Sequence, residues 1–117
     1  MRTLPNNAPT NVAALDDRDP DSGNASHEYG IQFGGPDAVC SIQFQHGPRG
    51  LETSTAGVFD DDLLAIVQDR MEGFQSGPFA CEENAYALDA IREAREALGV
   101  RVARRIKAGV LGVNKSH

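Results

Sequence analysis

The sequence contains no tryptophan, only two cysteines and only two tyrosines. None of its apolar runs approaches the roughly 20 residues that a membrane span requires. Residues 1–21 contain no apolar segment of the kind that secretory signals carry. Cys40 and Cys81 do not have the spacing of metal ligands. We therefore expect no membrane span, no secretion and reduced thiols, which together favour a cytoplasmic location.

Basic residues are scarce along most of the chain. Acidic residues number 17 and basic residues 11, giving a net charge of −6. This balance argues against bulk binding of DNA, RNA or acidic membranes. All the acidic residues precede Gly99, whereas five basic residues follow it: Arg101, Arg104, Arg105, Lys107 and Lys115. An acidic protein with such a concentrated basic end can still hold a small anion there.

Residues 1–26 have few apolar side chains, so this segment is expected to be a disordered tail with no ligand role. Two short runs with period-2 alternation follow, separated by the turn-forming residues 34–37. This pattern predicts an antiparallel β-hairpin over residues 27–45. Because two strands alone are marginal in water, we expect the apolar face of the hairpin to be covered.

Two segments with helical periodicity come next, over residues 60–75 and 81–108. Asp60, Asp61 and Asp62 are expected to provide the N-cap and first-turn charges of the first helix. The second segment carries a near-heptad apolar stripe: Leu88, Ile91, Leu98, Val102 and Ile106. The predicted fold is α+β, with a β-hairpin or small sheet packed on an antiparallel two-helix hairpin. We expect one domain over 27–112 and a short tail at 113–117.

The two predicted helices differ in length. At 1.5 Å per residue they are roughly 22 Å and roughly 40 Å long. The second helix therefore overhangs the first after Gly99, where Val102 and Ile106 still continue the apolar stripe. Either the β-hairpin or a second chain must cover that overhang. We favour a homodimer, because so small a core gains from oligomerisation.

The sequence offers little support for catalysis. His27, His46 and His117 are scattered, with no pair at helical i, i+4 spacing, so we expect no metal site. Cys81 lies near a helix start but has no histidine nearby, and we interpret it as a buried structural thiol. A nucleophile and base set is therefore missing, and we expect a protein that is not an enzyme and has no cofactor.

A binding site is better supported. Arg101 and Arg105 are i, i+4 neighbours, and no acidic residue follows Glu96. The planar fork of arginine suits phosphate oxygens. A solvated basic helix end remains the alternative interpretation.

The run LLAIVQDRMEGFQSGPFACEEN, residues 63–84, and FQHGP, residues 44–48, resemble a known family of small phage proteins. These proteins act as sponges for the cyclic nucleotide signals of bacterial immunity. The family includes anti-Thoeris and anti-CBASS members that share a helical hairpin domain. The resemblance covers about residues 27–112 and is strongest to the anti-Thoeris branch.

The resemblance implies strands on a helical hairpin, assembled as homodimers and sometimes as hexamers, which are trimers of dimers. It implies binding without cleavage of a cyclic ADP-ribose isomer made by a TIR-domain enzyme, in the cytoplasm of the infected host. The family's pocket residues match Phe74, Asn84, Arg101, Arg105 and Arg49 here. Their implied roles are adenine stacking, ribose or base contact, pyrophosphate binding by the arginine pair, and a second cation or lid contact from Arg49. A core role for Phe74 and a capping role for Asn84 remain alternatives.

The helix geometry adds a constraint on this site. Asn84 and Arg101 lie on one predicted helix, roughly 26 Å apart. Cyclic ADP-ribose spans about a third to a half of that length, so one chain cannot close both ends on one ligand. Two antiparallel protomers can, which predicts two symmetry-related pockets at a dimer interface. The remaining alternatives are a sponge for cyclic di- or trinucleotides and a module for protein–protein interaction.

Overall fold

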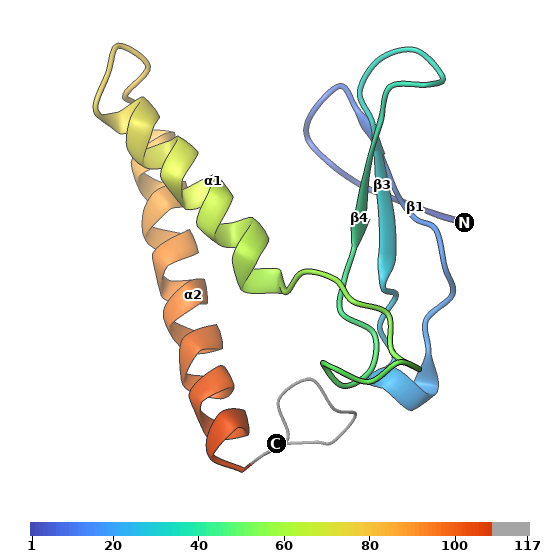
Figure 1. Cartoon of the computed structure of the whole chain (residues 1–117). Helices are drawn as coiled ribbons and strands as arrows, with labels where there is room; N and C mark the ends of the chain where they lie inside the picture. Colours follow the sequence, from blue (N-terminus) through green and yellow to red (C-terminus); the bar gives the residue numbers. More distant parts are fainter. Residues whose placement is uncertain (109–117) are drawn as a thin grey trace. The chain divides into compact units, whose positions relative to one another are not determined.

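The computed structural model describes residues 1–108 (Figure 1). The chain divides after Val58 into a sheet unit and a helical unit. The predicted α+β fold is confirmed, since a β-sheet comes first and a helical hairpin follows. The described residues form two compact units, and one domain over 27–112 stays a prediction. The expected tail at 113–117 lies outside the described residues.

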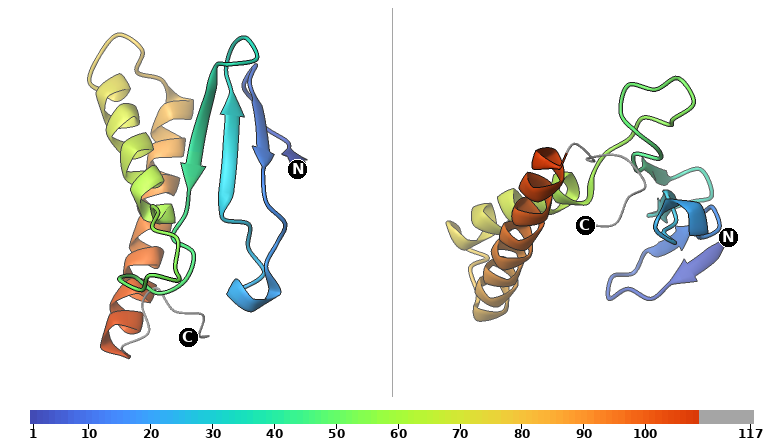
Figure 2. Two further views of the ribbon diagram at one scale, coloured as in Figure 1. Left: turned by 45° about the vertical axis from the view of Figure 1, so that its right-hand side comes forward. Right: turned by 90° about the horizontal axis from the view of Figure 1, so that it is seen from below.

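The sheet unit is built from four antiparallel strands in sequence order (Figure 2). The strands are β1 (Arg2–Leu4), β2 (Asn11–Ala14), β3 (Glu28–Gln32) and β4 (Val39–Gln43). The predicted hairpin is the β3–β4 pair, in which Tyr29 lies opposite Ile42 and Ile31 opposite Cys40. These pairs gather the apolar side chains of the two strands on one face of the sheet.

The N-terminal segment forms strands, so the expectation of a disordered tail at 1–26 is wrong. Strand β2 pairs with β3 and places Val12 opposite Ile31 and Ala14 opposite Tyr29. Ala14 is completely buried. The segment has too few apolar residues to fold alone, but β3 supplies both a hydrogen-bonding edge and an apolar face. Composition within a window cannot detect such a partner.

A carboxylate fastens the chain where it enters β3. Asp16 accepts hydrogen bonds from the backbone N–H groups of His27 and Glu28, each at 3.0 Å. Burial acts to raise the pKa of Asp16, but these N–H groups outweigh it and hold the pKa below its usual value. A short 3₁₀ turn, η1 (Pro20–Ser22), lies between Asp16 and β3. The Asp19 carboxylate caps this turn by accepting a hydrogen bond from the N–H of Asp21.

Two histidines that the sequence separates are stacked in the sheet unit. The rings of His27 and His46 lie 3.9 Å apart between centroids, with an interplanar angle of 4°. Nε2 of His46 lies 3.0 Å from a carboxylate oxygen of Asp19 and 3.1 Å from the hydroxyl of Ser22. His27 is 8% exposed, and its Nδ1 has no hydrogen-bond partner among the described residues.

This stack predicts acid sensitivity of the sheet unit. Burial, and then the neighbouring His46, lower the pKa of His27, against weaker opposing effects of Asp16 and Asp19. The unfolded chain therefore takes up a proton near pH 6.5 while folded His27 stays neutral. The free energy of unfolding should fall as the pH drops from about 7 toward the lowered pKa, by at most about 1.4 kcal/mol per pH unit.

Urea unfolding followed by NMR signals of β3, at several pH values between 7.5 and 5.5, measures this effect. The variant His27→Phe keeps a ring against His46 and removes the titrating group, so its stability should depend less on pH. Equal pH dependence of the two proteins would show that His27 is not the source.

Gly57 is required by close backbone packing. Its N–H donates to Oε1 of Gln45 at 3.2 Å. A Cβ at this position would collide with backbone atoms of Gln43 and Phe44 at the end of β4. Gly57→Ala should therefore lower the free energy of unfolding by about 1–3 kcal/mol, as measured by chemical denaturation. Gly35→Ala is the control, because no described atom lies within 4 Å of its added Cβ; equal losses in both variants would contradict the steric account.

The helical unit consists of α1 (Asp60–Gln75) and α2 (Glu82–Lys107), which lie side by side in both views of Figure 2. Their bounds fall within one residue of those predicted. The N-cap of α1 is Phe59, not an aspartate, and the Asp62 carboxylate accepts the Phe59 N–H at 2.8 Å. The carboxylate thus stabilises the helix start from inside the first turn.

Polar contacts fix how α1 and α2 pack. Nε of Arg95 donates to Asp61 at 2.8 Å, and Nη1 of Arg95 donates to Gln68 at 2.8 Å. The hydrogen bond from Arg95 lowers the pKa of Asp61. Arg92 also pairs with Glu72 at 3.2 Å. Asp61 therefore joins the two helices, a role beyond the first-turn charge predicted for it.

Apolar burial in the helical unit is modest. Leu88 is the buried hydrophobic residue of α2. Among the described residues, large apolar side chains that remain mostly exposed on the two helices are Ile66, Tyr86, Val100 and Ile106. Val102 is half-buried. The overhanging end of α2 thus keeps apolar surface exposed in the single chain.

Candidate functional site

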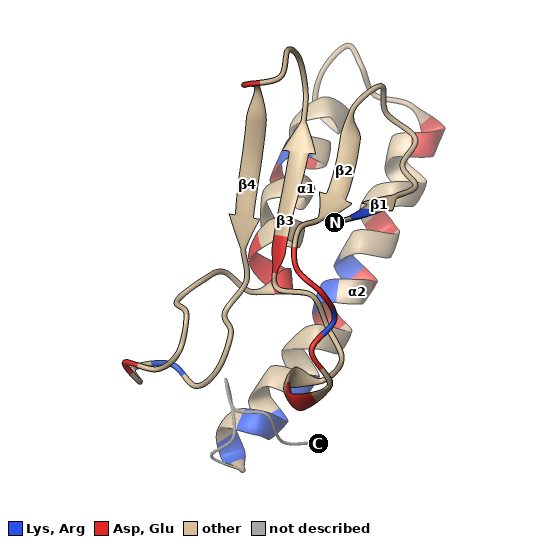
Figure 3. Ribbon diagram, turned by 90° about the vertical axis from the view of Figure 1, so that its right-hand side faces the viewer, with Lys and Arg blue, Asp and Glu red and all other residues tan. Residues whose placement is uncertain are grey.

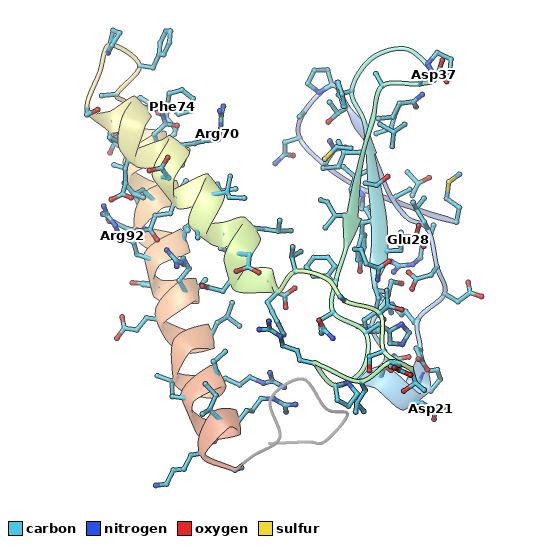
Figure 4. The ribbon with its side chains drawn as sticks, in the orientation of Figure 1. Asp21, Glu28, Asp37, Arg70, Phe74 and Arg92 are labelled. Carbon is cyan, nitrogen blue, oxygen red and sulfur yellow. The ribbon has the colours of Figure 1, made fainter. Side chains whose placement is uncertain are left out.

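One group of candidate residues lies where α1 meets α2. The Phe74 ring, on the last turn of α1, contacts Phe79 edge-on, with 6.3 Å between ring centroids and an interplanar angle of 71°. The guanidinium carbon of Arg70 lies 5.3 Å from the centroid of Phe74 (Figure 4). Phe79 is 72% exposed. The C-terminal part of α1 and the connection to α2 therefore present two aromatic rings and a cation, which suits a planar anionic ligand.

Asn84 approaches the same place from α2. Its side-chain amide donates a hydrogen bond to the carbonyl of Phe79 at 3.3 Å. The N-cap of α2 is Cys81, whose side chain makes no capping hydrogen bond. The capping alternative for Asn84 is therefore wrong, since its amide holds the interhelix loop instead. Phe74 and Asn84, ten residues apart in sequence, both contact Phe79.

The arginine pair lies at the opposite end of α2, where Figure 3 shows basic residues gathered. Arg101 is exposed, whereas Arg105 is 5% exposed. Burial, and then the charges of Arg101 and Arg104, lower the pKa of Arg105. Closely spaced like charges repel, and a bound anion relieves that repulsion. The structure thus places three positive charges close together at this end of the helix.

The two groups are not brought together within one chain. Asn84 and Arg101 lie on one continuous helix, α2, at positions separated by roughly 26 Å along its axis. The structure therefore places aromatic and amide groups at one end of the helical unit and guanidinium groups at the other.

Arg49 belongs to the sheet unit, on the loop between Phe44 and Val58. Backbone hydrogen bonds between His46 and Thr55, at 2.9 and 2.8 Å, close this loop at its base. Nε2 of Gln45 adds a hydrogen bond to the carbonyl of Gly47 at 3.0 Å. The loop that carries Arg49 thus has a base fixed by hydrogen bonds.

The sequence patterns did not predict a place in the site for Arg70, Gln75 or Phe79. The signal for Phe79 was available, because a phenylalanine in a Gly-Pro-Phe turn between two helices lies where little core exists to bury it. Cys81 is exposed, so the interpretation as a buried thiol is wrong. No group of three histidine, cysteine or acidic residues within 1–108 is placed to hold a metal ion.

Comparison with known proteins identifies the class. Residues 36–103 match the family described as Acb2/Tad1, hairpin domain. The match covers more than half of the chain, so the chain belongs to this family of hairpin-domain proteins, as the resemblance predicted. The matched segment includes Phe74, Asn84, Arg101 and Arg49, and it ends before Arg105.

A particular relative is Thoeris anti-defense 1 from Bacillus phage SBSphiJ7. It is 38% identical to this chain over 77 residues, which make up 66% of this chain and 54% of that protein. The chain therefore spans about half the length of the curated relative it matches. Within the described residues, neither helix is long and apolar enough to cross a membrane.

Proposed function

We propose that this protein is a phage anti-defence protein that acts in the cytoplasm of the infected bacterium. It binds and sequesters, without cleaving, a cyclic nucleotide immune signal, and the signal favoured is a glycocyclic ADP-ribose isomer made by a TIR-domain enzyme. The family match across the segment that holds Phe74, Asn84 and Arg101 carries this proposal. Similarity to a protein named Thoeris anti-defense 1 supports it.

The proposed pocket is shared by two chains. Because α2 separates Asn84 from Arg101 by roughly 26 Å, the aromatic end of one protomer must meet the arginine end of another. Two antiparallel copies satisfy this twice, giving two pockets related by symmetry. The exposed side chains of Val100 and Ile106, at 65% and 60%, support burial against a partner. A hexamer built from three such dimers keeps the same pockets.

The roles of the side chains follow from their chemistry. Arg101 and Arg105 bind the pyrophosphate through charge-assisted hydrogen bonds. Phe74 stacks on adenine, and Asn84 offers hydrogen bonds to a ribose or base edge. Arg49 supplies a further cation. A sponge needs nanomolar affinity, about −12 kcal/mol, which enclosure of the ligand between two chains makes attainable.

A second candidate ligand is a cyclic di- or trinucleotide, as in the anti-CBASS branch. The resemblance of residues 44–48 and 63–84 to a family that includes an anti-CBASS branch keeps this ligand class as an alternative. A third candidate is a protein-interaction module without a nucleotide ligand, which the exposed Ile66 and Tyr86 favour, at 60% and 78% exposure.

Filtration tests sequestration and cleavage together. The protein is mixed with a glycocyclic ADP-ribose isomer, passed through a membrane that retains protein, heated, and filtered again. We expect the first filtrate to be depleted of ligand and the second to contain it chemically intact. Return of ligand fragments would identify an enzyme. If the first filtrate is not depleted of any isomer or cyclic oligonucleotide tested, the protein-interaction module is the remaining candidate function.

A further inference from the structure

We propose that Phe79 is a further ligand-binding residue, that its ring forms a second aromatic wall for a planar base, and that Gln75 positions it. This inference rests on the proposed function, because it deepens the description of the same site. It concerns the loop of residues 76–81 between α1 and α2, which contains the exposed ring of Phe79.

The loop is fixed at its two ends. Gln75 accepts the N–H of Cys81 through Oε1 at 3.0 Å and donates through Nε2 to the carbonyl of Cys81 at 3.1 Å. The amide of Asn84 holds the carbonyl of Phe79 at 3.3 Å. The hydroxyl of Ser76 donates to the carbonyl of Gly73 at 2.7 Å. Side-chain hydrogen bonds therefore brace both the start of the loop and its junction with α2.

Phe79 presents an exposed aromatic ring on a braced loop. Phenylalanine gains stability by burial, yet Phe79 is 72% exposed and contacts Phe74 edge-on. Its loop is already ordered, so little conformational freedom is lost when a ligand stacks on the ring. The position therefore combines apolar contact area with preorganisation, the two properties that a base-stacking platform needs.

The orientation of the two rings indicates what kind of ligand they can contact together. Because Phe74 and Phe79 are inclined at 71°, a flat base stacked on the face of one ring turns its own edge toward the other ring. The guanidinium of Arg70 lies 5.3 Å from the centroid of Phe74 and places positive charge beside the corner (Figure 4). Within the described residues Arg70 has no carboxylate partner. The corner thus suits the planar base of an anionic nucleotide.

Calorimetric titration of Phe79 variants tests this inference, with the glycocyclic ADP-ribose isomer that binds the unmodified protein as probe. Phe79→Ala should weaken binding by about 5- to 150-fold, the range for loss of one base–aromatic stack. Phe79→Tyr keeps the ring and should bind within about threefold of the unmodified protein. Phe33→Ala removes another mostly exposed phenylalanine, from the sheet unit, and should leave binding unchanged.

The role of Gln75 is tested by combining changes. Gln75→Ala should weaken binding, but the double variant Gln75→Ala, Phe79→Ala should bind no more weakly than Phe79→Ala alone, because Gln75 acts only through Phe79. Additive losses would overturn the positioning role.

The role of Phe79 and the binding of a nucleotide signal by the protein can be disproved separately. Unchanged binding by Phe79→Ala would overturn the role of Phe79 and leave the sponge intact. An unmodified protein that binds no nucleotide in the panel would overturn the proposed function, and the inference with it.

Discussion

Replacing Arg101 and Arg105 together by alanine is expected to weaken binding of the cyclic ADP-ribose signal by about 100-fold or more. Each arginine is proposed to make charge-assisted hydrogen bonds to the pyrophosphate, and such bonds contribute about 1.5–3 kcal/mol each. Two lost contacts therefore remove about 3–6 of the roughly 12 kcal/mol that a nanomolar affinity represents, which corresponds to a loss of about 100-fold or more. Calorimetric titration with the glycocyclic isomer measures the loss directly.

Two control variants distinguish loss of the binding site from loss of the fold and from a general loss of positive charge. Arg105 is 5% exposed, so its removal can disturb the fold, whereas Arg101 is exposed and Arg101→Glu tests the site alone. Lys107→Ala removes the same charge from a different side of α2 and should bind almost normally. Tight binding by both Arg101→Glu and the double variant, in proteins that remain folded, would contradict the assigned role of the pair.

Mixing two inactive variants should restore binding. One variant carries Phe74→Ala and Asn84→Ala, and the other carries Arg101→Ala and Arg105→Ala. Each proposed pocket combines the aromatic end of one protomer with the arginine end of the other. In a mixed dimer, one pocket therefore contains both substituted ends, and the other pocket contains two unsubstituted ends. With random exchange of protomers, half of the dimers are mixed, so about a quarter of all pockets should regain full affinity.

The stoichiometry of tight sites after unfolding and co-refolding the two variants together measures this recovery. Each variant refolded alone provides the control, and neither should show tight sites. If the co-refolded mixture also lacks them while mixed dimers are detected by mass spectrometry, the pocket is not shared between protomers as proposed.

Local patterns explain the elements that the sequence predicted well. The bounds of α1 and α2 are marked by acidic first turns, apolar periodicity and the Ser-Gly-Pro stop between them. The β3–β4 hairpin has clear alternation around a turn. These signals lie within a few residues of the feature that they predict, so a window along the chain contains them.

Long-range pairing explains the failures. Strand β2 is stabilised by β3, and Asp16 reaches across to the backbone of His27. The stack of His27 on His46 joins residues 19 positions apart. Arg95 reaches Asp61 from the other helix. None of these contacts has a local sequence signature, because each depends on how the chain returns to itself.

The residues of the candidate site also divide into those with a signal in the linear sequence and those that depend on the folded structure. Phe74, Asn84, Arg101 and Arg105 were predicted from a resemblance in linear sequence, and the helix length between them predicted a shared pocket. Phe79 required the structure, since its exposure and its contact with Phe74 follow from the path of the interhelix loop.

Calorimetric titration of the unmodified protein tests the central claim most directly. The panel contains two glycocyclic ADP-ribose isomers, canonical cyclic ADP-ribose, and several cyclic di- and trinucleotides. We predict nanomolar binding of one glycocyclic isomer at one ligand per chain, which is two per dimer. The absence of binding heat for every ligand, confirmed by equilibrium dialysis, would contradict the account.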